Sequence, residues 1–453
     1  MPAWTDHLDD PRAVLHFVGV GGSGMSALAQ HRAFGGGRAS GSDRGIDGGG
    51  LVEERGALEA AGVEVVPQDG SGVDGADVVV ASTAVEAAIP DLVRARERGV
   101  PIVHRADLLA ALVSSGPSIG IAGSSGKSTV TAMVFEILRH AGRDPGLITG
   151  GRLVSLLEQG RLGNAWRGAG PLVFEADESD GSLVKHRPEV GVVLNLHRDH
   201  MPDEAVLEQY RAYREHVRGT FLVSGDAPLE PLRDGAVVYA LEDEPTLEAD
   251  RVRFEVDGVP VELPLPGRHN AENARAAIAV AAAVGVDPRT SAKALRAYRG
   301  VHRRYERIGE ARGVVVVDDF AHNPRKLRAV LETAAGRGGR VLAWWQPHGF
   351  APTRFLKDEL IDAFAEAVRP DDRLWLAPIY FAGGTVSRDV ASDDLVAALV
   401  RRGTPAALAV ERDRWIDEVR ATARDGDVVL VLGARDPTLP ALARRVLERL
   451  SSP

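Results

Sequence analysis

The stretch that most constrains this chain is residues 118–130, Ser-Ile-Gly-Ile-Ala-Gly-Ser-Ser-Gly-Lys-Ser-Thr-Val. An apolar run, a glycine turn and a helix-forming run follow one another, which predicts a strand, a turn and a helix. Gly123 and Gly126 let the backbone bend so that successive N–H groups meet an anion at the positive end of the helix dipole. Lys127 is expected to reach the outer phosphates of a nucleotide, and the Ser128 hydroxyl to bind Mg²⁺.

The spacing of this turn is shorter than that of the general phosphate-binding loop, because two residues separate its glycines where the general pattern has four. Taken alone, the run is also compatible with a glycine-rich turn that carries a solvated lysine.

Two later predicted strands end in groups that suit a metal beside phosphates. Residues 172–174 run into a series of carboxylates that begins at Glu175, and residues 190–196 run into a polar series that ends at His200. Because the carboxyl ends of parallel strands meet at one edge of a sheet, we expect these groups to converge with the glycine turn on one Mg²⁺ site. The acidic series by itself is also compatible with a solvated loop.

The first segment contains a second glycine turn. Residues 13–29 predict a strand, a turn and a helix, with Gly19, Gly21 and Gly24 in the spacing of a dinucleotide-type turn. Asp43 ends the next predicted strand, where a carboxylate would meet a ribose hydroxyl. These features alone are compatible with NAD, a nucleotide sugar or no ligand. Further predicted strands alternate with helices, which indicates a parallel sheet covered by helices.

Length and charge exclude several classes of protein. A chain of 453 residues exceeds what one core usually supports, so two or three domains are expected. The net charge of −10, without any Lys/Arg-rich run, argues against a nucleic-acid-binding surface. The absence of cysteine excludes disulfides and thiolate metal sites. Without a signal-peptide pattern or an apolar run of about 18 residues, we expect no membrane insertion and a cytoplasmic protein.

Four sequence blocks occur in a characteristic order. They are Gly-Val-Gly-Gly-Ser-Gly-Met-Ser at 19–26, Glu-Ala-Asp-Glu-Ser-Asp at 175–180, Gly-Arg-His-Asn-x-x-Asn at 267–273 and Arg-Arg-Tyr-Glu at 303–306. Together they resemble the Mur ligases, the ATP-dependent amide-forming enzymes of peptidoglycan synthesis. The order of the blocks is most similar to that of the UDP-N-acetylmuramate–L-alanine ligases. The short glycine turn is also similar to the version that this family uses.

The resemblance implies an α/β fold of three domains. Residues 1–114 would form a Rossmann-like domain for the UDP part of a sugar nucleotide, residues 115–299 a central P-loop-type ATPase domain, and residues 300–453 a C-terminal Rossmann-like domain that binds the amino acid. It also implies an ADP-forming acid–amino-acid ligase that uses ATP and Mg²⁺ and passes through an acyl phosphate. Its partners would be UDP-N-acetylmuramate or a similar sugar nucleotide and the amine of an amino acid or peptide.

The resemblance also assigns site residues. The catalytic residues would be Lys127, Glu175 and His200. The metal-binding residues would be Ser128 and Glu175, which bind Mg²⁺, and His200, which binds a second Mg²⁺ or lies beside it. The nucleotide would be bound by Gly123, Ser124, Ser125, Gly126, Lys127, Ser128, Thr129, Asn270, Asn273, Arg304 and Asp318 or Asp319. The two other substrates would be bound by Gly21, Gly22, Ser23, Gly24, Met25, Asp43, Ser82, His322, His348 and Arg354. Asn270 and Asn273 could alternatively cap a helix, and either His200 or Glu178 could accept the proton of the amine.

The chain departs from the pattern near the expected amino-acid site. Gly349 and Pro352 stand where the L-alanine ligases carry arginines. Loss of a bidentate guanidinium would weaken binding of a free amino acid by on the order of 2 kcal/mol or more, unless Arg354 partly substitutes. We therefore hypothesise that the acceptor is a recycled peptide or another amino acid rather than free L-alanine, or that it is held differently.

Two other classes stay open from the sequence. A non-catalytic nucleotide-binding homologue is disfavoured by the presence of Lys127, Ser128, Glu175 and His200 together. An NAD oxidoreductase would leave the turn at residues 123–128 unexplained.

Overall fold

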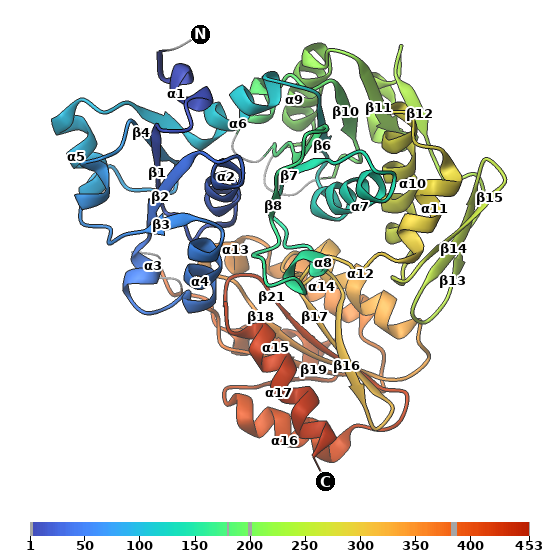
Figure 1. Ribbon diagram of the computed structural model, residues 1–453. Helices are drawn as coiled ribbons and strands as arrows, with labels where there is room; N and C mark the ends of the chain where they lie inside the picture. Colours follow the sequence, from blue (N-terminus) through green and yellow to red (C-terminus); the bar gives the residue numbers. More distant parts are fainter. Residues whose placement is uncertain (1–2, 179–180, 198–201, 382–386, 453) are drawn as a thin grey trace. The chain divides into compact units, whose positions relative to one another are not determined.

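The computed structural model describes residues 3–178, 181–197, 202–381 and 387–452 (Figure 1). The chain forms two compact units. The first consists of Met1–Pro245, Phe254–Leu263 and Ala271–Val301, and the second of Thr246–Arg253, Pro264–Asn270 and His302–Pro453. Each unit is an α/β structure built around parallel strands, as the sequence predicts.

The first sheet of the first unit has five parallel strands in the order β3-β2-β1-β4-β5. Its strands are β1 (Val14–Val18), β2 (Arg38–Ser42), β3 (Val63–Val65), β4 (Val78–Ala81) and β5 (Ile102–His104). Its helices are α1 (Asp6–Asp9), α2 (Ser23–Phe34), α3 (Arg44–Asp47), α4 (Val52–Ala60), α5 (Pro90–Arg98) and α6 (Arg105–Ser114). The strand order reverses between β1 and β4, where open parallel sheets bind ligands beyond the carboxyl ends of the strands.

The second sheet has seven strands in the order β12-β11-β10-β6-β9-β7-β8. They are β6 (Ser118–Ala122), β7 (Gly146–Ile148), β8 (Ala165–Trp166), β9 (Leu172–Glu175), β10 (Val190–Val193), β11 (Thr220–Ser224) and β12 (Val237–Tyr239), and only β8 runs antiparallel to its neighbour. The helices are α7 (Lys127–His140), α8 (Val154–Leu157), α9 (Asp203–His216), α10 (Arg268–Ala283) and α11 (Pro288–Arg296). The predicted strand, turn and helix at 118–130 are thus β6, its loop and α7, with β9 and β10 on either side of β6.

The second unit is built on a six-stranded sheet in the order β16-β17-β21-β18-β19-β20, parallel except for β16. The strands are β16 (Glu306–Ala311), β17 (Val314–Asp319), β18 (Val341–Gln346), β19 (Arg373–Leu376), β20 (Ala406–Leu408) and β21 (Val428–Gly433). The helices are α12 (Pro324–Ala335), α13 (Phe350–Phe355), α14 (Lys357–Ala367), α15 (Ser392–Arg401), α16 (Arg412–Thr422) and α17 (Leu439–Ser451). A small sheet of β13 (Thr246–Leu247), β14 (Val252–Val256) and β15 (Val259–Leu263) lies in the segment where the chain passes between units.

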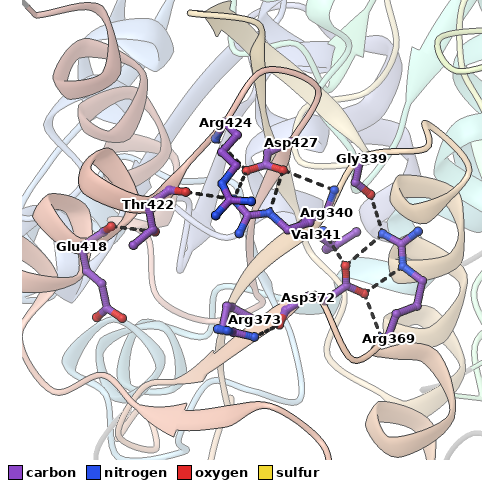
Figure 2. Close-up of polar contacts among 10 residues, drawn as sticks. All are labelled: Gly339, Arg340, Val341, Arg369, Asp372, Arg373, Glu418, Thr422, Arg424 and Asp427. Carbon is purple, nitrogen blue, oxygen red and sulfur yellow. Dashed lines mark hydrogen bonds and ion pairs between the residues drawn. The ribbon is translucent and has the colours of Figure 1, made fainter.

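Two carboxylates fix the amino-terminal edge of the six-stranded sheet (Figure 2). Asp427, which precedes β21, is 3% exposed and pairs with the Arg340 guanidinium at 2.6 Å. Asp372, which precedes β19, accepts from the Val341 backbone N–H at 2.7 Å and pairs with Arg369 at 2.9 Å. These pairs tie the beginnings of three neighbouring strands together, so the opposite, carboxyl-terminal edge is the one left for a site.

Among the residues that the structure describes, no helix combines the length and apolar character needed to cross a membrane.

Candidate active site

The loop between β6 and α7 forms the expected cradle. Gly126 has φ +84° and Gly123 φ +143°, backbone conformations that residues with a Cβ rarely adopt. A Cβ on Gly126 would lie 2.4 Å from Oδ1 of Asn273, and a Cβ on Gly123 would lie 2.9 Å from Cβ of Leu194. Both positions therefore require glycine, and Asn273 lies directly against the cradle.

Asn195, which sequence reasoning missed, holds the cradle in shape. Its Oδ1 accepts from the Ser125 backbone N–H at 2.9 Å, and its Nδ2 donates to the Ser125 carbonyl at 3.1 Å. The backbone carbonyl of Asn195 accepts from the Ser124 N–H at 3.3 Å, and the Ser124 hydroxyl accepts from the N–H of His197. Thr129 follows in the first turn of α7 and is buried.

Lys127 begins α7 and already has anionic partners. Its ammonium group donates to the Gly123 carbonyl and to Oε2 of Glu178, both at 2.8 Å, and lies 3.5 Å from Oδ1 of Asp177. Burial alone would lower the pKa of Lys127, but the carboxylates of Glu178 and Asp177 outweigh it and raise that pKa above its usual value. Lys127 is therefore a fixed positive charge beside the cradle.

Glu175 ends β9 and is held by the loop that follows β7. Its Oε1 accepts from the N–H groups of Gly150 at 3.0 Å and Gly151 at 3.4 Å, and from the hydroxyl of Thr149. Ser128 lies against the same loop, because a Cβ on Gly151 would be 3.0 Å from Cβ of Ser128. The structure thus brings together two of the three expected metal ligands.

These groups suit Mg²⁺ in kind. The carboxylate of Glu175 and the hydroxyl of Ser128 are hard oxygen donors, and Mg²⁺ commonly takes one or two protein ligands together with substrate phosphates and water. The described residues contain no cluster of three or more His, Asp or Glu side chains that could hold a metal without such help. His200, the third expected ligand, lies outside the described residues.

A cavity of about 420 Å³ in the first unit extends from the glycine turn after β1 to the loop after β7. Its lining includes most of the residues expected to bind the sugar nucleotide, namely Gly22, Ser23, Gly24, Met25, Asp43 and Ser82. It also includes Thr149, Gly150 and Glu175 from the second sheet. Arg105, at the start of α6, supplies a positive charge to the same lining, with Nη1 3.0 Å from where a Cβ on Gly24 would lie.

Asp43 and Asn164 fix the turn after β1. Asp43 accepts from the N–H groups of Gly21 at 3.1 Å and Gly45 at 2.7 Å, so its carboxylate shapes the turn and caps α3. Asn164 is fully buried and donates to the Ser23 carbonyl at 2.8 Å and to the Ser26 hydroxyl at 2.9 Å. The predicted contact between Asp43 and a ribose stays a prediction.

In the second unit, the expected amino-acid residues His322 and His348 lie together at the carboxyl-terminal edge of the sheet. Their ring centroids are 4.8 Å apart in an edge-to-face arrangement. Burial, helped by the charge of Lys326, lowers the pKa of His322 to about 3, so this imidazole is neutral at physiological pH. Arg354 instead pairs with the Asp389 carboxylate and donates to the Ser387 carbonyl at 2.9 Å.

The residues expected to reach the nucleotide from this unit have structural partners. Asp318 is fully buried and pairs with Arg303 at 3.0 Å; burial raises the pKa of Asp318 to about 6 even though Arg303 opposes the rise. Asp319 accepts from the N–H groups of Tyr305 and Ala321. Arg304 lies over the ring of Phe320, with its guanidinium carbon 5.3 Å from the centroid.

Asn270, at the start of α10, donates its side-chain amide to the Pro266 carbonyl at 2.7 Å and is 5% exposed. The side chain donates to a carbonyl and so does not cap the free N–H groups of α10. Its role toward adenine stays a prediction.

Comparison with known proteins places this arrangement in a family. The model described as "Mur ligase family, catalytic domain" matches residues 14–116, and that described as "Mur ligase, glutamate ligase domain" matches residues 303–435. The UDP-N-acetylmuramate–L-alanine ligase of Gloeobacter violaceus is 38% identical over 97% of this chain and 96% of its own length. The chain belongs to the Mur ligase family. This confirms the resemblance inferred from the four sequence blocks.

Other relatives agree. A UDP-N-acetylmuramate–L-alanine ligase of Aromatoleum aromaticum is 38% identical over 93% of this chain and 95% of its own length. Among solved structures, the UDP-N-acetylmuramate–alanine ligase of Thermotoga maritima matches this Mur ligase with a TM-score of 0.79 at 26% identity, over 96% and 98% of the two chains. A murein peptide ligase of Psychrobacter arcticus has the same fold, with a TM-score of 0.68 at 22% identity over 97% and 99%.

Proposed function

We propose that this Mur ligase joins L-alanine to the carboxylate of UDP-N-acetylmuramate, with ATP converted to ADP and phosphate, in peptidoglycan synthesis. The observation that carries the proposal is the position of Glu175. Glu175 lines the same cavity as the residues expected to bind the sugar nucleotide. It also accepts a hydrogen bond from the loop after β7, which contacts Ser128 of the cradle. A substrate carboxylate in the cavity and a terminal phosphate in the cradle would therefore be neighbours. The relatives in Gloeobacter violaceus and Aromatoleum aromaticum, both UDP-N-acetylmuramate–L-alanine ligases, support the choice of substrates.

The chemistry requires activation of the carboxylate, because oxide is a very poor leaving group. A carboxylate oxygen attacks the γ-phosphorus, the bond to the β,γ-bridging oxygen breaks, and ADP leaves. The amine nitrogen then attacks the acyl carbon, phosphate departs, and the amine loses a proton. Lys127 and the free N–H groups in the first turn of α7 stabilise the charge on the transferred phosphoryl group, since the N–H groups of Ser124 and Ser125 are bound to Asn195.

Mg²⁺ when bound would supply further positive charge to the phosphates, with Ser128 and Glu175 as its protein ligands and His200 either on a second Mg²⁺ or beside it. Only in the position beside the metal is the imidazole nitrogen of His200 free to accept a proton. Glu178 is buried and paired with Lys127, which favours His200 over Glu178 as the proton acceptor. The three-domain division at 114/115 and 299/300, with the amino acid bound by the last domain, belongs to the same proposal.

The test is product formation by the purified protein. UDP-N-acetylmuramate, ATP and Mg²⁺ are incubated with L-alanine, glycine, L-serine or a muropeptide-type peptide, and both ADP release and the amide product are measured by mass spectrometry. We expect product with L-alanine above the other acceptors. Preference for the peptide would favour the recycling alternative, and ADP release without any amide would contradict ligation.

Lys127→Ala is the matched variant for this assay. Removal of one preorganised charge at the transferred phosphoryl group costs on the order of 100- to 1,000-fold in kcat. Unchanged ADP release in Lys127→Ala would favour the non-catalytic interpretation of the nucleotide site.

A further inference from the structure

Arg435 follows β21 at the carboxyl-terminal edge of the six-stranded sheet, and its backbone is held on both sides. The carbonyls of Gly433 and Ala434 accept from the Arg303 guanidinium at 2.6 and 3.4 Å. Asp436 accepts from the Thr438 N–H at 2.8 Å and pairs with the Arg412 guanidinium. The Arg435 side chain is exposed, and none of the described residues forms a hydrogen bond or ion pair with it. Arg435 is therefore an exposed cation on a fixed backbone.

The strand register places Arg435 level with the two site histidines. β21 lies between β17 and β18, pairing Leu432 with Asp319 on one side and Gly433 with Gln346 on the other. Three residues beyond the first pair are Arg435 and His322. Two residues beyond the second pair are Arg435 and His348. Arg435, His322 and His348 therefore follow three neighbouring strands, at the same level beyond the strands' carboxyl ends.

The position of Gly349 shows how near the Arg435 side chain lies to the segment after β18. A Cβ on Gly349 would lie 3.9 Å from Nη1 of Arg435, so the guanidinium lies within van der Waals distance of a side chain at position 349. Gly349 also has φ +149°, a conformation that favours glycine. The segment after β18 thus carries no cation at Gly349 or Pro352, and the neighbouring strand supplies one at the same place.

We infer that Arg435 binds the α-carboxylate of the incoming amino acid, an inference that rests on the proposed function. A guanidinium matches a carboxylate with two parallel hydrogen bonds, and a fixed backbone reduces the entropy lost on binding. Two of the neighbouring cations are otherwise engaged, because Arg303 pairs with Asp318 and Arg354 with Asp389. The neutral His322 can contact the amino acid but supplies no charge to balance a carboxylate.

The test separates the carboxylate from the amine of the acceptor. In Arg435→Ala we expect the KM for L-alanine to rise on the order of 10- to 100-fold, the range for hydrogen bonds to a charged group. The KM values for ATP and UDP-N-acetylmuramate should stay within about twofold, since the inferred role of Arg435 concerns the amino acid alone. The reaction with L-alaninamide, which has the same amine but no carboxylate, should change little, and Arg435→Lys should restore part of the loss.

Arg401→Ala, an exposed arginine at the end of α15, is the matched control and should leave every constant unchanged. Thermal unfolding of each variant checks that the fold is intact. Suppose that the wild-type protein makes product. The role of Arg435 is then overturned, while the proposed function stands, by either of two results: Arg435→Ala leaves the KM for L-alanine unchanged, or it raises the KM values of all substrates and of L-alaninamide alike. If the wild-type protein makes no amide with any amino acid, both are overturned.

Discussion

The cradle depends on Asn195, and its replacement by alanine is a direct test of how the site binds nucleotide. The side chain makes two hydrogen bonds to the Ser125 backbone, at 2.9 and 3.1 Å. Each is worth about 1 kcal/mol net, so Asn195→Ala should cost the ordered cradle about 2 kcal/mol. That free energy corresponds to a KM for ATP raised about 30-fold. The KM for UDP-N-acetylmuramate should change little, because Asn195 does not line the cavity of the first glycine turn.

The matched variant is Asn164→Ala, which removes a buried asparagine from the other turn, where it donates to Ser23 and Ser26. It should raise the KM for UDP-N-acetylmuramate and spare that for ATP. Steady-state ADP release with each substrate varied in turn gives both constants, and thermal unfolding confirms that the variants are folded. If Asn195→Ala left the KM for ATP within twofold of wild type, or if both variants raised both constants equally, the assignment of one asparagine to each turn would be wrong.

Two further predictions concern stability. Asp427→Ala removes the partner of Arg340, and breaking a fully buried ion pair costs about 3–5 kcal/mol. Because Arg340 is 22% exposed and can rehydrate, we expect the free energy of unfolding, measured in urea, to fall by about 2 kcal/mol. Asp371→Ala, which replaces an exposed carboxylate, is the control and should change it little. Burial, helped by the charge of Arg167, lowers the pKa of the His31 imidazole from 6.5 to about 3. Below pH 6.5 the unfolded chain binds a proton at His31 that the folded chain does not bind. The free energy of unfolding therefore decreases as the pH is lowered, by about 2 kcal/mol from pH 7 to pH 5. His31→Gln should remove that part of the pH dependence in unfolding curves at the two pH values, and an unchanged slope would contradict it.

The cradle could be predicted from the sequence because its parts are adjacent in the chain. Strand, glycine turn and helix lie within residues 118–130, and the positions of Gly123, Gly126 and Lys127 follow from local geometry alone. Asn195 could not be found in this way, because it is 70 residues from the Ser125 that it binds. The convergence of β6, β9 and β10 was predictable from their polar ends, whereas the short β8 and the small sheet of β13–β15 have no comparable signal.

The partners of charged side chains were the least predictable part of the site. Arg354 was expected to replace a missing guanidinium, but Asp389, 35 residues away in the chain, pairs with it. Asp318 was expected to face nucleotide, and the structure buries it against Arg303. In both cases the sequence indicates the charge and its strand end, but only the fold determines which opposite charge lies nearest.

The charges around the cradle support the proposal that a divalent cation binds there. Glu175, Asp177 and Glu178 lie at or beside the cradle, and Lys127, in contact with the last two, is already offset by them. A triphosphate and the carboxylate of a sugar nucleotide would bring several more negative charges into this half-buried region, where repulsion is screened less than in water. One ammonium group cannot balance that sum. In the proposed function, a cation bound by Ser128 and Glu175 would therefore serve substrate binding as well as catalysis, because it would allow two anionic substrates to occupy adjacent sites at the same time.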